Sequence, residues 1–443
     1  MATKLLSRRQ IWSQSWPLIF ANAAIPLVGV IDTAVIGISG NATDLAGVAL
    51  GGAIFAIFYW GTYALRQSTT ALVSQAIGRS DRRQSQLVLM RSGLLGLAFG
   101  AGVLLFHQPI TDFSFGVLQG SIGAEATGRE YVKWRFAGIP AAIALFAITG
   151  WMIGAGLPRM AMMVQLLLAF INTVLDIWFV IGLGWGPMGV ALGTSIAEWV
   201  ALFLGLVLVL QYIHKTTGFS SVLYKWSYVF HFAEFKQLLT VNRDLFIRSG
   251  CMIVGFTWFI NSGAKQGDAI LAGNQILLQF ITVWAFVLDA FAYTAEAHTG
   301  RATGKKSRID LLRAVRFTSE YAVATAIACS LLTLLAGPFL LSAIISDQQA
   351  LQAALLYLPW CALVPIIGVA AWQLDGIFVG ATRSAAMRNS AIISVFIYLA
   401  VDYFLTSSYG NSGVWAAFLI YYLARGLTLI IAWPALLRSI QTG

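Results

Sequence analysis

The sequence is poor in charged residues. Only 10% of its 443 residues are Asp, Glu, Lys or Arg, whereas about 25% is usual for a soluble domain. Hydrophobic residues make up 58% of the chain, which leaves too little polar surface for a soluble protein. The alternating segments of about ten residues that mark an outer-membrane barrel are missing as well. The composition therefore predicts an all-α integral membrane protein.

Cysteine and histidine are scarce too. Cys251, Cys329 and Cys361 are far apart and fall in apolar runs, so we expect packing roles and neither a disulfide framework nor a metal site. The four histidines have no metal-ligand spacing. No phosphate-binding loop, Ser–His–Asp set or cofactor motif is present in the sequence. We therefore expect no enzyme activity, no cofactor and no metal.

Apolar runs of about 20 residues or more, each long enough to cross a bilayer as a helix, recur twelve times. The first run continues past the length of a signal peptide and lacks a small-residue cleavage site, so no cleavable leader is expected. The predicted spans are 11–38, 47–75, 87–107, 131–153, 160–183, 187–212, 238–262, 268–297, 312–336, 351–378, 388–407 and 411–433.

Basic residues fall on one side of this twelve-span arrangement. Because Lys and Arg concentrate in cytoplasmic loops, both termini are expected in the cytoplasm. The same loops account for the net charge of +10, so we expect no nucleic-acid partner. The basic positions are Lys4, Arg8, Arg9, Arg79, Arg82, Arg83, Arg159, Lys215, Lys225, Arg301, Lys305, Lys306, Arg308, Arg383, Arg388 and Arg438.

The two halves of the chain resemble each other at a nearly constant offset, which predicts a parallel internal repeat. We expect two pseudo-symmetric six-helix lobes, residues 1–212 and 238–443, joined by a cytoplasmic linker at 213–237 that could contain a short interfacial helix. Such lobes usually enclose a central cavity and alternate its access. The matched pairs are Gly78-Arg79 with Gly300-Arg301, Gly154-Ala155 with Gly380-Ala381, Asp176 with Asp402, and Gly189-Val190 with Gly413-Val414.

The first span combines a carboxylate with two prolines. Asp32 lies among apolar residues, where an acid costs several kcal/mol and is a functional candidate by default. Pro17 and Pro26 each remove a backbone hydrogen bond and are candidate hinges. Asn22 is a further polar candidate in this span.

The fifth span carries Asn172 and Asp176 at i and i+4, on one helix face. If spans 1 and 5 pack together, these side chains form an acid–amide cluster with Asp32. Two carboxylates in a low dielectric do not both ionise cheaply, so the cluster is expected to load and release a proton near neutral pH. The alternative is a structural role, and for Asn172 a helix–helix hydrogen bond.

The second half has its own charged residues. Asp289 and Glu296 lie at i and i+7 in span 8, and Asp375 lies in span 10, with Arg248 of span 7 as a candidate counter-ion. A transport role and a buried ion pair that fixes helix packing both remain open.

Arg66, Glu198 and Asp402 also lie within predicted spans. We expect Arg66 and Glu198 either to pair or to leave Arg66 reaching the membrane surface. Asp402 matches Asp176 by repeat but has Tyr398 where Asn172 stands.

Several strings together resemble the multidrug and toxic compound extrusion (MATE) family, and its DinF-like branch in particular. They are PLIFANAAIPLVGVIDTAVIG, WMIGAGLPRM followed by NTVLD, VNRDLFIRS, AFVLDAFAYTAEAHTG and LDGIFVGATRSAAMRNS. The resemblance implies twelve helices in two lobes around a V-shaped cavity. It also implies export of organic cations and other toxic compounds in exchange for H⁺ or Na⁺.

In the DinF-like branch, the positions associated with proton coupling match Asp32, Asn172 and Asp176, and bending of the first span is linked to that protonation. Sodium-coupled NorM-type relatives carry one acid in span 7 and another in span 10, and this chain has only Asp244 near the start of span 7. That departure disfavours the NorM-type sodium site, although Asp375 keeps it open.

These observations favour a monomeric, proton-coupled multidrug antiporter of a bacterial inner membrane, with small lipophilic cations as substrates. Abundant aromatic residues suit flat cations, although they also anchor spans at the membrane surface. The alternatives are a sodium-coupled drug antiporter, a citrate-like organic-anion exporter favoured by Arg248 and Arg66 in the cavity, and a lipid-linked oligosaccharide flippase. Twelve spans with acids in the first half argue against the flippase.

Overall fold

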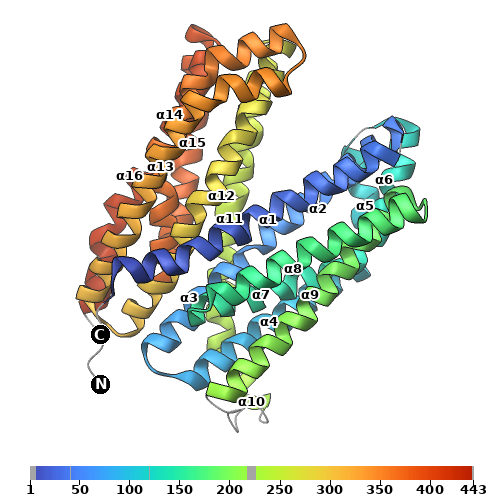
Figure 1. Ribbon diagram of the computed structural model, residues 1–443. Coiled ribbons are helices and arrows are strands. Elements are labelled where there is room, and N and C mark those ends of the chain that lie inside the picture. Colours follow the sequence, from blue (N-terminus) through green and yellow to red (C-terminus); the bar gives the residue numbers. More distant parts are fainter. Residues whose placement is uncertain (1–5, 40, 119, 217–225, 442–443) are drawn as a thin grey trace. The chain divides into compact units, whose positions relative to one another are not determined.

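The computed structural model describes residues 6–39, 41–118, 120–216 and 226–441, and these residues form helices without any strand (Figure 1). In chain order, the helices are α1 (Arg8–Ser39), α2 (Ala42–Thr62), α3 (Ala64–Gly78), α4 (Arg82–Leu105), α5 (His107–Val117), α6 (Ile122–Arg135), η1 (Phe136–Gly138), α7 (Ile139–Ala155), α8 (Pro158–Asp176), η2 (Ile177–Gly182), α9 (Gly186–Thr216), α10 (Trp226–Val229), α11 (Phe232–Ala264), α12 (Asp268–Gly304), α13 (Arg308–Ile344), α14 (Gln348–Gly380), α15 (Ser384–Tyr409) and α16 (Asn411–Gln441).

The prediction of twelve membrane spans is confirmed. Twelve stretches of the described chain are long and apolar enough to cross a bilayer as helices. The second span is divided at Tyr63 into α2 and α3, and the fourth is divided into α6, the 3₁₀ turn η1 and α7. Helix α5 was not predicted, and its 11 residues are too few to cross a bilayer.

The turn η1 has a clear local cause. Pro140 occupies the start of α7 and has no backbone N–H to continue the hydrogen-bond ladder of α6. The chain therefore tightens over Phe136–Gly138 before α7 begins. This turn leaves Arg135 as the last residue of α6, buried in the interior.

Helix α8 ends at a second irregular turn. The π-helical segment η2 follows Asp176 directly, and Gly184 and Gly186 then turn the chain with φ angles of 72° and 53°. Positive φ angles are easily adopted only by glycine. Single π turns often occur at functional sites, and this one places Asp176 at a helix boundary.

The corners between helices reveal the internal repeat. Left-handed residues occur at Ser80, Gly156 and Gly184 in the first half, and at Lys306, Thr382 and Gly410, each 226 positions later, in the second. The pairing of Gly78-Arg79 with Gly300-Arg301 is therefore wrong by one helical turn. The helix that ends at Gly78 corresponds to the one that ends at Gly304. Gly300-Arg301 lies four residues before that helix end and matches Gly78-Arg79 in residue type only.

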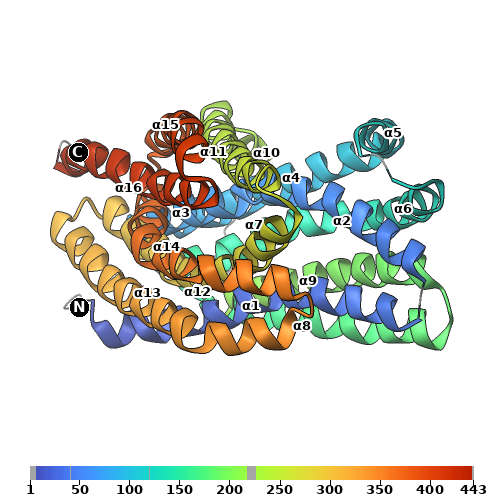
Figure 2. The ribbon, with the colours of Figure 1, turned by 90° about the horizontal axis from the view of Figure 1, so that it is seen from above.

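The chain divides into two compact units. We call Phe20–Asn242 the first lobe, and Met1–Ile19 together with Arg243–Gly443 the second lobe. In the first lobe α8 and α9 run side by side, and in the second lobe α12 packs along α14 (Figures 1 and 2). The division falls within α1, between Pro17 and Pro26.

The first turns of α1 are tied into the second lobe by several side chains. Arg8 forms an ion pair with Glu320 at 2.8 Å. Ser15 and Thr294 share a hydrogen bond of 2.8 Å between their hydroxyls, and Gln14 contacts the imidazole of His298 at 3.0 Å. These contacts explain why α1 starts in one unit and ends in the other.

Part of the predicted linker is described. Residues 217–225 of the linker at 213–237, Lys225 among them, lie outside the described residues, as does Lys4. The linker contains the short helix α10, which belongs to the first lobe, and its last residues form the start of α11 at Phe232. Arg91 of α4 holds it by donating to the carbonyl oxygens of Tyr228 at 2.6 Å and Val229 at 2.9 Å.

Candidate functional site

Three of the predicted site residues meet inside the first lobe. Asp32 of α1 is 9% exposed, and Asn172 and Asp176 of α8 are completely buried. The carboxyl of Asp32 lies against both the carboxyl of Asp176 and the amide of Asn172. The i, i+4 spacing on α8 accounts for the shared direction of Asn172 and Asp176. The grouping expected from the sequence is therefore the arrangement that the structure shows.

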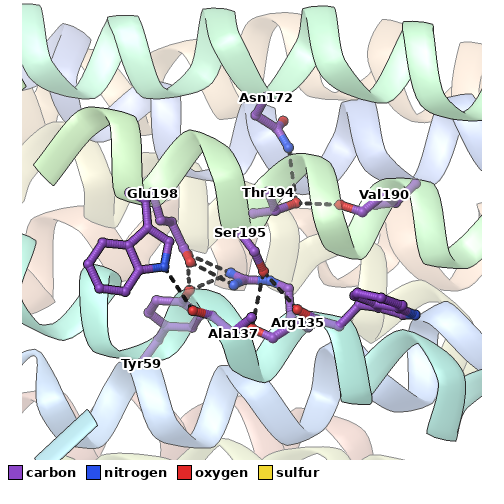
Figure 3. Close-up of polar contacts among 10 residues, drawn as sticks. Tyr59, Arg135, Ala137, Asn172, Val190, Thr194, Ser195 and Glu198 are labelled. Carbon is purple, nitrogen blue, oxygen red and sulfur yellow. Dashed lines mark hydrogen bonds and ion pairs between the residues drawn. The ribbon is translucent and has the colours of Figure 1, made fainter. Parts of the chain in front are cut away.

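A hydrogen-bond chain fixes the amide of this cluster. Asn172 donates through Nδ2 to Thr194 Oγ1 at 3.0 Å, and Thr194 in turn donates to the carbonyl oxygen of Val190 at 2.9 Å. Figure 3 shows Asn172 reaching from α8 to Thr194 on α9. The hydrogen bond from Asn172 to Thr194 therefore holds the Asn172 side chain in one orientation beside the two acids.

The carboxylate of Asp176 lacks hydrogen-bond donors. Among the described residues, no N–H or O–H group donates with good geometry to either of its oxygens, or to Asn172 Oδ1. Buried carboxylates normally accept hydrogen bonds, because desolvation without them is costly. A proton held by either Asp32 or Asp176 would supply the missing donor and remove the repulsion between the two charges. The arrangement thus suits uptake and release of a proton or a small cation.

Gly193 of α9 allows this close packing. A Cβ atom at Gly193 would lie 2.5 Å from Asp176 Oδ1, so only glycine lets α9 approach the carboxylate. We expect Gly193→Ala to reduce transport strongly, because its methyl group displaces Asp176 from Asp32, and overpacking of this kind costs about 1–3 kcal/mol of stability. The measurement is ethidium efflux driven by a pH gradient in proteoliposomes, normalised to the amount of folded protein.

The matched control for that substitution is Gly102→Ala on α4. A Cβ atom there would meet no atom within 4 Å, so transport should match the wild type. Equal activity of the Gly193 and Gly102 variants would contradict the role assigned to this contact.

A second polar group lies in the same lobe. Arg135 at the end of α6 binds both carboxylate oxygens of Glu198 on α9, with N–O distances of 2.8 and 2.7 Å. The hydroxyl of Tyr59 on α2 contacts both side chains. Arg135 and Glu198 are 5% and 4% exposed, so this is a buried, bidentate ion pair (Figure 3).

This pair corrects the expectation for Glu198. The predicted partner was Arg66, but Arg135 satisfies both carboxylate oxygens. The guanidinium of Arg66 instead lies over the ring of Tyr63, 4.7 Å from its centroid. Arg135 was inside the predicted fourth span, so an unassigned cation within an apolar run was the available signal.

In the second lobe, Asp375 binds two arginines. Its Oδ2 accepts from Arg248 at 2.7 Å and from Arg425 of α16 at 2.5 Å, and all three side chains are buried. Arg248 is therefore a counter-ion, as the sequence suggested, and its charge is engaged by Asp375. Arg425 was not identified from the sequence. The arrangement is a buried ion cluster that joins α11, α14 and α16.

The other second-half candidates, Asp289 and Glu296, lie on α12, which packs along α14. Asp289 is half-buried on α12 and accepts a long hydrogen bond of 3.4 Å from the hydroxyl of Tyr293. Glu296 is completely buried two turns further along the same helix. Whether Asp289 and Glu296 act together with Asp375 stays a prediction.

The repeat-related acids differ in their surroundings. Asp402 on α15 accepts hydrogen bonds from Trp258 Nε1 at 2.8 Å, Ser262 at 2.7 Å and Thr406 at 2.7 Å. Among the described residues, Asp176 has no such set of donors. Three neutral donors satisfy the carboxylate of Asp402, as is usual for a buried polar group with a structural role.

The remaining predicted residues lie on α1. Asn22 is 5% exposed, Pro17 is buried and Pro26 is half-buried. Helix α1 runs without interruption from Arg8 to Ser39 through both prolines. The hinge roles of Pro17 and Pro26 stay predictions.

Known proteins with similar sequences identify the family of this chain. A profile of the MatE family matches residues 17–178 and 251–404. The chain is 34% identical over 433 residues to the DNA damage-inducible protein F of Escherichia coli (strain K12), covering 98% of this chain and 93% of that protein. It is 22% identical to the multidrug export protein MepA of Staphylococcus aureus (strain MW2), covering 93% and 92%.

The fold agrees with a solved structure over its full length. An outward-facing multidrug resistance MATE family transporter of the MOP superfamily superposes with a TM-score of 0.90 at 17% identity, covering 100% of both chains. The predicted fold class, an all-α integral membrane protein of twelve membrane-spanning helices, is thereby confirmed. On the family profile and the 34% identity together, the chain belongs to the MatE family of membrane transporters.

Proposed function

We propose that this protein is a proton-coupled antiporter that exports lipophilic, cationic toxic compounds across a bacterial inner membrane, as a monomer with both termini in the cytoplasm. The observation that carries the proposal is the buried Asp32–Asp176 pair, in which two carboxyls meet without hydrogen-bond donors for Asp176. A proton is the smallest group that satisfies such a pair.

The pair explains antiport through competition for charge. In the deprotonated state the carboxylates favour an organic cation electrostatically, and aromatic side chains suit its flat surface. Proton binding from outside neutralises the pair and removes that attraction. Because the proton and the substrate compete for the same carboxyl pair, binding of the proton releases the substrate, and the two cross the membrane in opposite directions.

Helix α1 is suited to link this step to a change of conformation. It carries Asp32, and its hydrogen-bond ladder is weakened at Pro17 and Pro26. We propose that neutralising Asp32 lets α1 bend at one of these prolines and reduce the volume of the binding site. Bending is therefore expected to depend on protonation.

The test is ethidium transport by purified protein in proteoliposomes. An imposed pH gradient should drive efflux by the wild type in sodium-free buffer. The variant Asp32→Asn should lose this dependence, because an amide carries no titratable proton. Wild-type transport that ignores the pH gradient, or full activity of Asp32→Asn, would contradict the proposal.

Sodium is the second candidate for the coupling ion. Among the described residues, the oxygens of Asp176 and Asn172 Oδ1 lack donors, and oxygen atoms of this kind are the ligands that hard cations prefer. The same proteoliposomes distinguish the two ions. A sodium gradient that drives efflux at equal pH on both sides would favour sodium.

A further inference from the structure

We propose that the Arg135–Glu198–Tyr59 group is a charge-compensating device that sets the pH range over which the Asp32–Asp176 pair exchanges protons. This inference rests on the proposed function, because it assigns a regulator to the same site. Arg135 and Glu198 are positioning residues in this scheme: they act on the carboxyl pair electrostatically and do not carry the transported proton.

The group is held rigidly. Arg135 and Glu198 form two parallel N–H···O bonds, and the Tyr59 hydroxyl donates to Glu198 and accepts from Arg135. Gly138 in η1 permits the approach of Glu198, since a Cβ atom at Gly138 would collide with Glu198 Oε2. A buried arginine in such a fork has little freedom to turn towards another acid.

Helix α9 joins this group to the proton site. Thr194 accepts from Asn172, while the next residue, Ser195, donates to the carbonyl oxygen of Trp134 at 3.0 Å. Glu198 follows one turn after Thr194 and binds Arg135 (Figure 3). Trp199 Nε1 donates to the carbonyl oxygen of Ala137 at 2.9 Å. One stretch of α9 thus fixes both polar groups relative to each other.

The two groups are within electrostatic reach. The charge of Arg135 acts on Asp32 and on Asp176, and the charge of Glu198 acts on Asp32. In a buried environment such interactions are screened much less than at the surface. Because Glu198 binds Arg135 and carries the opposite charge, it offsets part of the positive field that Arg135 exerts on the Asp32–Asp176 pair.

Few other titratable side chains face this group from the helices packed around it. Tyr131 of α6 also lies within reach of Arg135, Asp32 and Glu198. His107 of α5 faces the ring of Phe136 with 5.9 Å between ring centroids. Helix α7 has no titratable side chain along Ile139–Ala155. Arg135 is thus the cation through which the balance is set among these neighbours.

The test is the midpoint of pH-dependent ethidium binding by full-length protein in detergent. Glu198→Gln leaves the charge of Arg135 uncompensated, which favours ionised carboxylates, so the midpoint should move to lower pH by about one unit. Arg135→Gln leaves Glu198 uncompensated, so the midpoint should move to higher pH by a similar amount. The double variant should return close to the wild-type midpoint.

Glu234→Gln is the matched control. Glu234 forms an ion pair of 3.3 Å with Arg91 in the same lobe. Loss of its charge should leave the midpoint unchanged. A structural role alone would lower the amount of folded protein without moving the midpoints in opposite directions. If either single variant fails to fold, the other single variant and the double variant still give a signed prediction.

The outcomes separate this inference from the proposed function. Binding of ethidium by the wild type that does not depend on pH would overturn the proposed proton coupling. A pH-dependent wild type with unchanged midpoints in the folded Glu198 and Arg135 variants would overturn the inference alone. Opposite shifts, cancelled in the double variant, would support it.

Discussion

Proton-driven efflux is expected to fall to background when Asp176 is replaced by asparagine. The amide keeps the size of the side chain and supplies a donor to the Asp32 carboxyl in place of the second carboxyl. The variant should therefore fold at least as stably as the wild type. It carries no titratable proton, so the pair can no longer exchange one. The measurement is ethidium efflux from proteoliposomes under a pH gradient, together with thermal unfolding in detergent.

The control for this result is Asp112→Asn. Asp112 is an exposed acid of the same lobe that pairs with Arg129 at 2.6 Å, and its side chain is 71% exposed. Its replacement should change neither efflux nor stability appreciably. Efflux by Asp176→Asn at the wild-type rate would show that the proton is carried elsewhere.

Replacing Asp375 by asparagine is expected to destabilise the protein strongly. The carboxylate is the shared partner of Arg248 and Arg425, and both guanidinium groups are buried. Removing one member of a buried ion cluster leaves uncompensated charge and typically costs about 3–5 kcal/mol. A large fall in melting temperature in detergent, and a low yield of monodisperse protein, are the expected observations.

Glu320→Gln provides the comparison within the same lobe. Glu320 accepts from Arg8 and Arg316 at a solvent-accessible position. Exposed ion pairs contribute little to stability, so the melting temperature should barely change. Equal melting temperatures of the Asp375 and Glu320 variants would contradict the structural importance of the buried cluster.

Local patterns predicted much of this molecule. Long apolar runs indicate the twelve spans directly, because bilayer thickness sets helix length. The proximity of Asn172 and Asp176 follows from helical periodicity, and Asp32 follows from the cost of an acid among apolar residues. These are properties of single helices, which explains why the sequence alone is enough to identify them.

Partners between helices could not be predicted in the same way. Glu198 binds Arg135 rather than Arg66, and Asp375 binds Arg425 as well as Arg248. Which cation meets which acid depends on how α6, α9, α14 and α16 pack, and spacing along one helix carries no such information. The alignment of the two halves was limited in a similar way. A chance Gly-Arg pair shifted one match by a helical turn, and the left-handed residues at the helix corners give the correct offset.

Asp176 and Asp402 occupy matching positions in the internal repeat but tolerate change differently. The corners of the two halves keep the same spacing, yet among the described residues only the first half leaves its acid without donors. The second half surrounds its acid with Trp258, Ser262 and Thr406. The pseudo-symmetry of the backbone therefore does not extend to the hydrogen bonds of the two acids. Substitutions that preserve hydrogen bonding should be tolerated at Asp402, and only a titratable side chain at Asp176.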